Sequence, residues 1–130
     1  MKGLRLYKKE KLCSATAIEA LFDRSAAAAA ETRHALAYPL RAVWRQNPGR
    51  RADCPQFLIV IPKKRMRHAV DRVALRRRVR EAYRLNRELL DRTARTDIAL
   101  IWVADTAKPY ADIERAMRRL LSRINDEPQS

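Results

Sequence analysis

The chain has 130 residues, of which 47% are hydrophobic, and it carries 29 lysines and arginines against 15 aspartates and glutamates. This length and apolar content fit one globular domain with a single core and exclude a chain that is disordered throughout. The net charge of +14 indicates a polyanionic partner, either RNA, DNA or an anionic membrane surface.

The sequence shows neither a targeting signal nor a cysteine pattern typical of a metal site. The N-terminal residues contain no apolar core of a signal peptide, and no apolar run approaches the length of about 18 residues that a membrane helix needs. Cys13 and Cys54 fit neither a Cys-x-x-Cys nor a Cys/His ligand pattern, so we expect reduced thiols. These features predict a cytoplasmic protein.

The first part of the chain predicts an extended segment followed by a helix. Residues 1–12 alternate basic and apolar side chains and are expected to lie extended along the surface. Ser14 is a typical N-cap residue, and an apolar stripe after it predicts a helix over residues 15–24. The alanine run 26–30 either continues this helix or forms a small-residue linker, and we expect it to be variable rather than functional.

Three segments have the patterns of strands. Residues 33–46 alternate between two faces, which predicts one strand with an edge position or a bulge at Pro39. A turn or loop is expected at 47–51. The continuous apolar runs 57–61 and 98–104 are typical of strands that are buried on both faces.

Two segments have apolar residues at helical spacing. The first begins near residue 68, ends between 91 and 95, and has an apolar side made of Leu75, Val79, Ala82 and Leu90. The second covers 111–124, starts beside Pro109, and precedes a frayed polar tail that includes 126–130.

A strand, a long helix and a strand in succession indicate a parallel pair joined by a crossover helix. We therefore predict that residues 1–130 form a single α+β domain. It would be a two-layer sandwich in the order helix–strand–strand–helix–strand–helix, with the helices packed on a small mixed sheet.

The segment from Lys63 to Arg84 holds ten basic residues and two acids. Four arginines recur at every fourth position of the predicted helix and form one ridge, with Arg77 and Arg87 near it: Arg72, Arg76, Arg80 and Arg84. Like charges at this spacing repel each other by roughly 0.2–0.5 kcal/mol per pair. A solvated basic helix is the alternative, but this repulsion along a whole helix favours a nucleic-acid surface.

No catalytic constellation is visible in the sequence. His34 and His68 have no Asp or Glu at ligand spacing, which argues against a metal site. The carboxylates of Asp53, Asp97 and Asp105 are isolated at element edges, where capping and turn roles are commoner. Together with the net charge, this favours a binding subunit over a nuclease that acts alone.

The order of these motifs resembles the protein component of bacterial ribonuclease P, the enzyme that matures the 5′ end of transfer RNA. The most specific match is the basic helix, in which Pro62-Lys63-Lys64, Ala69-Val70 and Arg72 precede Arg80-Glu81-Ala82-Tyr83-Arg84. Lys8–Leu12 with Ala20-Leu21-Phe22 is similar to the opening of the family, and Tyr38–Arg41 to its first long strand. The similarity covers approximately residues 6–124.

The chain departs from the family pattern at a few positions. Val73 and Ala74 stand where the family usually has Asn and Arg, and Ile18 stands where an aromatic residue is common. One extra residue lies between Lys64 and Ala69. We expect the assignment of roles to single residues to be weakest at these positions.

The resemblance implies a division of labour. In the family the RNA subunit holds the catalytic Mg²⁺ ions and performs the endonucleolytic hydrolysis, while the protein binds that RNA and the single-stranded 5′ leader of precursor tRNA. The implied fold is a ribosomal protein S5 domain 2-like sandwich with a left-handed crossover. No protein-bound cofactor, no membrane and no obligate protein partner are implied.

Carried over by position, the residues that bind RNA are Lys63, Lys64, Arg65, Arg72, Arg76, Arg77, Arg80 and Arg84. The leader cleft, between the first helix and the sheet, would contain Ile18, Phe22, Tyr38 and Arg41, with Trp44 as a further candidate. Aromatic stacking suits a leader of variable sequence, but for Ile18 and Trp44 core packing is the stronger expectation. A ribosomal or ribosome-assembly protein is the alternative function, because the composition fits it equally well.

Overall fold

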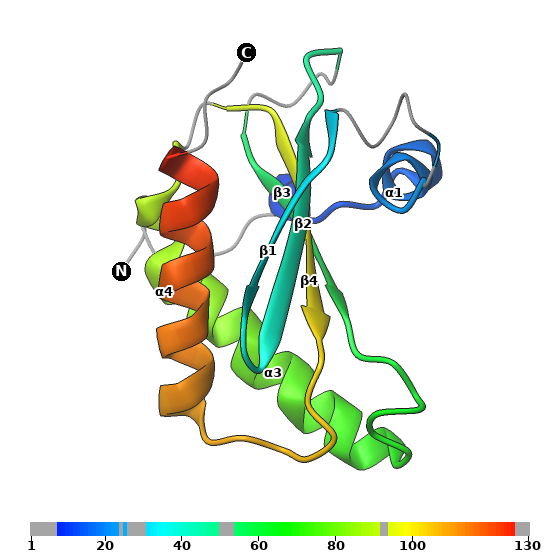
Figure 1. Ribbon diagram of the computed structural model, residues 1–130, viewed down its shortest axis with the longest axis vertical. Coiled ribbons are helices and arrows are strands. Elements are labelled where there is room, and N and C mark those ends of the chain that lie inside the picture. The colour runs from blue at the N-terminus through cyan, green and yellow to red at the C-terminus, as the bar shows by residue number, and fades with distance from the viewer. Residues whose placement is uncertain (1–7, 24, 26–30, 50–53, 92–93, 127–130) are drawn as a thin grey trace.

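The computed structural model describes residues 8–23, 25, 31–49, 54–91 and 94–126. It is a four-stranded mixed sheet with helices α3 and α4 on one face and helix α1 on the other (Figure 1). The strands are β1 (Arg33–Ala37), β2 (Leu40–Gln46), β3 (Gln56–Val60) and β4 (Thr96–Trp102), in the sheet order β1-β2-β4-β3. The helices are α1 (Ala15–Leu21), α3 (Ala69–Asn86) and α4 (Tyr110–Asp126), with 3₁₀ turns at Lys8–Glu10 and Arg87–Leu89. The predicted α+β class is confirmed.

Strand β4 is the centre of the core. It pairs with β2 in the antiparallel direction and with β3 in the parallel direction. Ile98, Leu100 and Trp102 belong to the cluster under α3 and α4, whereas Ala99 belongs to the cluster under α1. Burial on both faces accounts for the continuous apolar run. The pair β3 and β4, joined through α3, is the parallel pair that the sequence predicts.

Helices α3 and α4 each bury one side against the sheet. The six apolar positions predicted for the last helix are all buried: Ile113, Ala116, Met117, Leu120, Leu121 and Ile124. In α3 the predicted Leu75, Val79 and Ala82 are buried, together with Tyr83. The Tyr83 ring stacks on Phe57 of β3 with centroids 4.0 Å apart. α3 ends at Asn86, earlier than predicted, because the chain tightens into a 3₁₀ turn that directs Arg87 inward.

The prediction of one strand over residues 33–46 is wrong, because this segment is a hairpin. β1 and β2 pair antiparallel, and the two-residue turn between them contains a cis peptide bond at Tyr38-Pro39, as in type VI turns. The reversal resets the alternation of side chains. Ala35 and Ala37 therefore face α4 with the core, whereas Leu36 points to the α1 side. The sheet has one strand more than predicted.

The N-terminal segment closes the outer edge of β3. The Leu12 amide donates to the Phe57 carbonyl at 2.9 Å, and the Gln56 side chain donates to the Lys9 carbonyl at 2.7 Å. The prediction that residues 1–12 lie extended on the surface is therefore wrong for residues 8–12, since Glu10 and Leu12 are buried. Leu58 and Val60 lie on the α1 side of β3 and are only half-buried, so the predicted burial on both faces does not hold there.

Helix α1 covers only part of its face of the sheet. Ser14 caps it as predicted, and its hydroxyl oxygen accepts from the Ala17 amide at 3.3 Å. The helix ends at Leu21, three residues before the predicted end, so it is about 10 Å long. Its buried cluster is Leu12, Ala17, Leu21, Val43 and Ala99. Residues 1–7, the alanine run 26–30 and residues 127–130 lie outside the described part of the chain.

A buried ion pair joins the N-terminal segment to the end of α3. An Arg87 guanidinium nitrogen lies 2.6 Å from a Glu10 carboxylate oxygen, and the two side chains are 1% and 4% exposed. Removing one partner of such a pair leaves a buried charge without its counter-charge. We expect Glu10→Leu to lower the free energy of unfolding in urea by about 3–5 kcal/mol.

The exposed Glu88→Ala serves as the control, with an expected change below about 0.5 kcal/mol. The double variant Glu10→Leu/Arg87→Met, which removes both charges, should regain much of the lost stability. Equal stability of Glu10→Leu and the unaltered protein would contradict a structural role for this pair.

Candidate nucleic-acid interface

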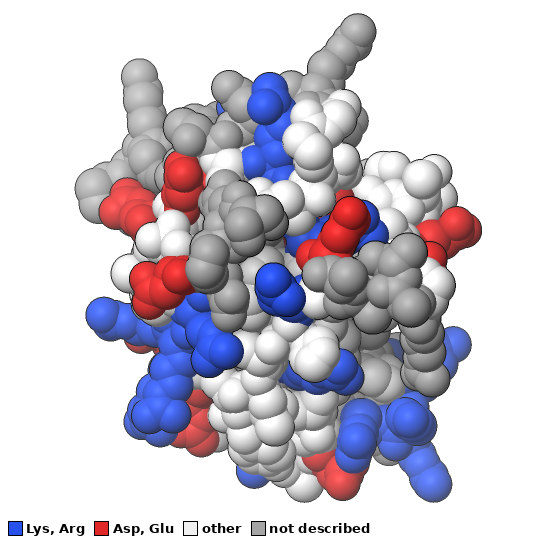
Figure 2. Space-filling model, turned by 45° about the horizontal axis from the view of Figure 1, so that its top comes forward, with Lys and Arg blue, Asp and Glu red and all other residues white. Residues whose placement is uncertain are grey.

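The eight predicted RNA-binding residues lie on one continuous stretch, the connection from β3 to α3 and the α3 helix itself. Lys63 and Lys64 are exposed in the connection. Arg77 and Arg80 are exposed on α3, and neither side chain makes a hydrogen bond or ion pair with another described residue. Figure 2 shows lysines and arginines gathered in the lower half of the molecule, on both sides of an uncharged band.

The other arginines of the ridge also hold the protein together. Arg72 donates to the carbonyls of Met66 and Arg67 at 2.9 and 2.7 Å, and Arg76 donates to the Ile59 carbonyl at 2.7 Å. The Arg72 bonds fix the β3–α3 connection against the first turns of α3, and the Arg76 bond ties α3 to β3 itself. A guanidinium has five N–H donors, so both arginines keep donors for phosphate oxygens.

Two further arginines of the predicted set have acidic partners. Arg65 pairs with Asp105 at 2.9 Å, and Arg84 pairs with Glu81 one turn earlier on α3. The hydrogen bond from Arg84 lowers the pKa of Glu81, and the same bond raises the pKa of Arg84. The pair therefore stays ionised at neutral pH, and the carboxylate reduces repulsion along the ridge.

Two arginines of this region point away from the ridge. Arg87, expected near it, is instead buried with Glu10, so that expectation is wrong. Arg78 donates to the Lys108 carbonyl at 3.1 Å and thereby ties α3 to the segment before α4. Val73, at a position where the chain departs from the family pattern, is half-exposed on α3, as is Ala74.

Three of the four predicted leader-binding residues share the α1 side of the sheet. Ile18 is half-buried and packs against the α1 cluster, while Phe22 at the end of α1 is 44% exposed. Arg41 is exposed on β2, on the same face as Val43. Its partner across the hairpin is Leu36, which is 68% exposed. The sequence interpretation missed Leu36 because the unrecognised turn placed it on the opposite face.

The structure separates Tyr38 and Trp44 from this group. Tyr38 lies in the hairpin turn, with the Lys108 ammonium 5.4 Å from its ring centroid. That turn is at the end of the sheet away from α1 (Figure 1). Trp44 is buried in the cluster under α3 and α4, as the core interpretation predicts.

Asp53 lies outside the described residues, and the histidines and the other carboxylates considered for catalysis are dispersed. His68 is exposed at the start of α3, Asp97 accepts from Asn47 at 2.9 Å, and Asp105 pairs with Arg65. In the described ranges, no three His, Cys, Asp or Glu side chains lie close enough together to hold a metal ion. The helices of the same ranges are too short or too polar to cross a membrane.

The profile of the Ribonuclease P family matches residues 6–125. This chain belongs to the ribonuclease P protein family. Ribonuclease P protein components from two strains of Porphyromonas gingivalis are 37% and 36% identical to it over 124 residues, which cover 92% of this chain and 85% of each relative. The predicted family is confirmed.

Solved structures of this family have the same fold. The ribonuclease P protein of Thermotoga maritima aligns with a TM-score of 0.68 over 88% of this chain and 96% of its own length. The Staphylococcus aureus protein aligns with a TM-score of 0.67 over 88% and 94%. Their sequence identities are 21% and 14%, so these structures bear on the fold alone.

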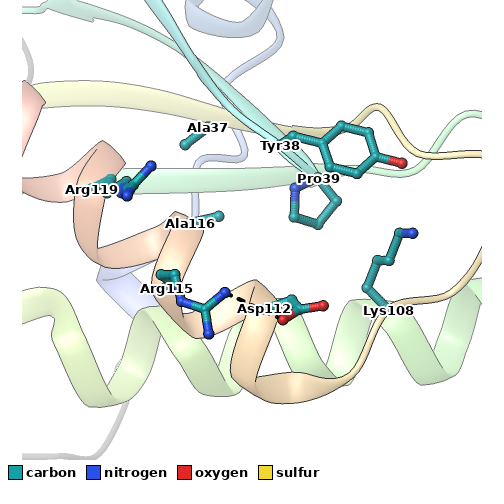
Figure 3. A pocket seen from close by; sticks show the side chains of 8 residues that line it. All are labelled: Ala37, Tyr38, Pro39, Lys108, Asp112, Arg115, Ala116 and Arg119. Atoms are coloured by element: carbon teal, nitrogen blue, oxygen red, sulfur yellow. Dashed lines mark hydrogen bonds and ion pairs between the residues drawn. The ribbon is translucent and has the colours of Figure 1, made fainter.

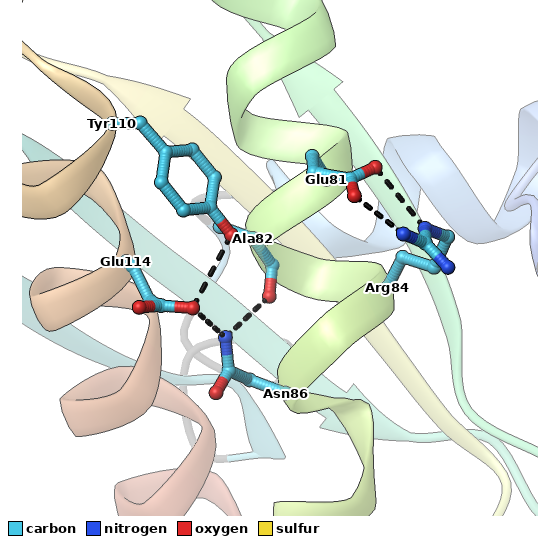
Figure 4. A network of polar contacts seen from close by, with 6 residues as sticks. All are labelled: Glu81, Ala82, Arg84, Asn86, Tyr110 and Glu114. Carbon is cyan, nitrogen blue, oxygen red and sulfur yellow. Dashed lines mark hydrogen bonds and ion pairs between the residues drawn. The ribbon is translucent and has the colours of Figure 1, made fainter. Parts of the chain in front are cut away.

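A polar network fixes the end of α3 against α4 (Figure 4). Asn86 donates to the Ala82 carbonyl at 2.8 Å and to the Glu114 carboxylate at 3.2 Å, and the Tyr110 hydroxyl donates to the same carboxylate at 3.2 Å. Burial, followed by the negative charge of Glu114, raises the pKa of Tyr110 from 10.0 to about 12. The folded state therefore favours the neutral phenol.

A raised folded-state pKa gives stability that is fully present below the unfolded pKa and is lost as pH rises through the folded pKa. The difference in unfolding free energy between the unaltered protein and Tyr110→Phe should be constant below pH 10 and shrink as pH rises to about 12. Urea titrations at stepped pH measure it. Glu114→Gln removes a cause of the raised folded-state pKa, so the loss should be smaller and should end at a lower pH. A difference that does not change with pH would refute the assignment.

Proposed function

We propose that this chain is the ribonuclease P subunit that binds the catalytic RNA through α3 and the segment before it. The same subunit takes the single-stranded 5′ leader of precursor tRNA on the α1 side of the sheet. In this proposal the RNA subunit holds the Mg²⁺ ions and hydrolyses the phosphodiester bond. The family membership and the exposed basic residues of α3 support it.

The α3 surface suits a folded RNA because two of its arginines are oriented by the protein before binding and two others are exposed without a partner among the described residues. Arg72 and Arg76 are oriented by backbone carbonyls, so they lose less side-chain freedom on contact with phosphates. The side chains of Arg77 and Arg80 are exposed and make no hydrogen bond or ion pair with a described residue, so no such bond has to break. Their contribution should be mainly electrostatic and therefore sensitive to salt.

The α1 side of the sheet suits an unpaired strand of any sequence. Phe22 offers an exposed ring, Leu36 an exposed apolar side chain and Arg41 a cation. Stacking of bases on aromatic rings tolerates sequence variation, and arginine binds the phosphates between them. Because α1 is short, it leaves Leu36 and Arg41 of the sheet exposed, and Phe22 at its own end is exposed on the same side.

Reconstitution with a bacterial ribonuclease P RNA tests the assignment. We expect the protein to raise the affinity and rate of that RNA toward precursor tRNA, and to cleave nothing alone. The double variant Arg77→Ala/Arg80→Ala should bind the RNA more weakly, and the slope of log K against log salt should fall by about 1.4–1.8. Arg95→Ala, exposed before β4, is the control and should bind nearly as the unaltered protein does.

If the unaltered protein neither binds nor assists this RNA, the proposed function fails. Crosslinking mainly to ribosomal RNA in cells would favour a ribosomal role instead. If the unaltered protein binds the RNA and the double variant binds it equally well with the same salt slope, Arg77 and Arg80 face solvent in the complex.

The proposed contact between Phe22 and the leader can be tested separately from RNA binding by α3. In the reconstituted enzyme, Phe22→Ala should weaken binding of precursor tRNA by about 1–3 kcal/mol, the range found for stacking of one base. Binding of mature tRNA, which has no leader, should stay the same, and Phe22→Tyr should restore precursor binding. Equal losses for precursor and mature tRNA would show that Phe22 acts on the fold and not on the leader.

A further inference from the structure

A second basic surface lies on the other side of the molecule from α1, between α4 and the edge strand β1. Two adjoining cavities of about 230 and 540 Å³ share Ala37 and Arg119 in their walls, so they form one groove along α4. We call it the α4 groove. Figure 3 shows its end at the hairpin turn, where Tyr38 and Pro39 face the first turns of α4.

The charge of the α4 groove is strongly positive. Its cationic residues are Lys108, Arg115, Arg118, Arg119 and Arg123, and its acids are Asp112 and Asp126. Asp112 already faces Arg115 at 3.5 Å. Arg118 and Arg119 are exposed, and their side chains have no hydrogen bond or ion pair with any residue in the described ranges. Ala35 and Ala37 line the β1 side with small side chains, which leaves the space open.

An exposed aromatic ring closes one end of the groove. Tyr38 is 61% exposed, and Lys108 approaches its ring to 5.4 Å. A ring beside a row of arginines is the combination that binds single-stranded nucleic acid, with a base on the ring and phosphates on the guanidinium groups. A base inside a duplex is already stacked on both sides, so the groove suits an unpaired segment.

We propose that the α4 groove binds an unpaired segment of the catalytic RNA, separate from the segment on α3. This inference rests on the proposed function. The α1 side of the sheet, where we propose that the leader binds, is the opposite face. The α4 groove lies on the face that α3 and α4 cover. Arg78 of α3 also bonds to the Lys108 carbonyl, which holds α3 against the Tyr38 end of the groove. One RNA bound to α3 is therefore the partner best placed to reach it.

Charge reversal in the groove gives a test with a matched control. Arg119→Glu and Arg95→Glu change the net charge equally, and both sites are exposed. In filter binding with bacterial ribonuclease P RNA alone, we expect Arg119→Glu to weaken binding at least tenfold and Arg95→Glu less than twofold. Tyr38→Leu should weaken binding about fivefold or more, and Tyr38→Phe should restore it.

A photocrosslink identifies which RNA occupies the groove. Ser122 lines the groove, so a benzophenone is attached at Ser122→Cys in a Cys13→Ser background, which removes the exposed native thiol. Crosslinks to an unpaired stretch of the catalytic RNA, formed without precursor tRNA, are the expected result. Crosslinks to precursor tRNA only, or to no RNA, would overturn the proposal.

The two proposals fail in different ways. If Arg77→Ala/Arg80→Ala weakens binding while Arg119→Glu matches its control, the groove proposal is wrong and the proposed function stands. If the unaltered protein does not bind the catalytic RNA at all, both are wrong.

Discussion

Burial of β4 on both faces is the constraint on which the rest of the structure depends. Ile98 and Leu100 need cover from one side and Ala99 from the other, so helices have to pack on both faces of the sheet. A chain with 29 lysines and arginines can supply that cover only if each helix keeps its cations on the outer side. The arginine surfaces of α3 and α4 are therefore a geometric result of the same packing that builds the core.

The sequence predicted those parts of the fold that depend on regular periodicity. The apolar positions of α4 and the parallel pair around α3 agree with the structure because both follow from local repeats. The hairpin at Tyr38-Pro39 was missed because strict alternation continues through it in the sequence, and a proline there also fits a bulge. That single turn moved Leu36 to the other face and Tyr38 to the opposite end of the candidate site.

Charge spacing predicted the location of the basic surface better than the role of each arginine. Arg76 and Arg87 look alike in sequence, yet one reaches a carbonyl of β3 and the other a carboxylate 77 residues away in the chain. Such partners arise only from the tertiary fold, so helical periodicity cannot reveal them. Helical periodicity cannot reveal the α4 groove for the same reason, since one of its walls comes from the hairpin.

The two outer edges of the sheet are protected by different means. At β3, the Leu12 amide bonds to the Phe57 carbonyl and Lys11 bridges Phe57, so the N-terminal segment occupies the edge at this residue. In the described part of the chain no strand pairs with the outer edge of β1. Open strand edges invite pairing between copies, and flanking positive charge discourages it. The positive charge of α4 beside this edge therefore disfavours pairing between two copies of the chain. Under the groove proposal, the RNA that neutralises this charge would also have to cover the β1 edge.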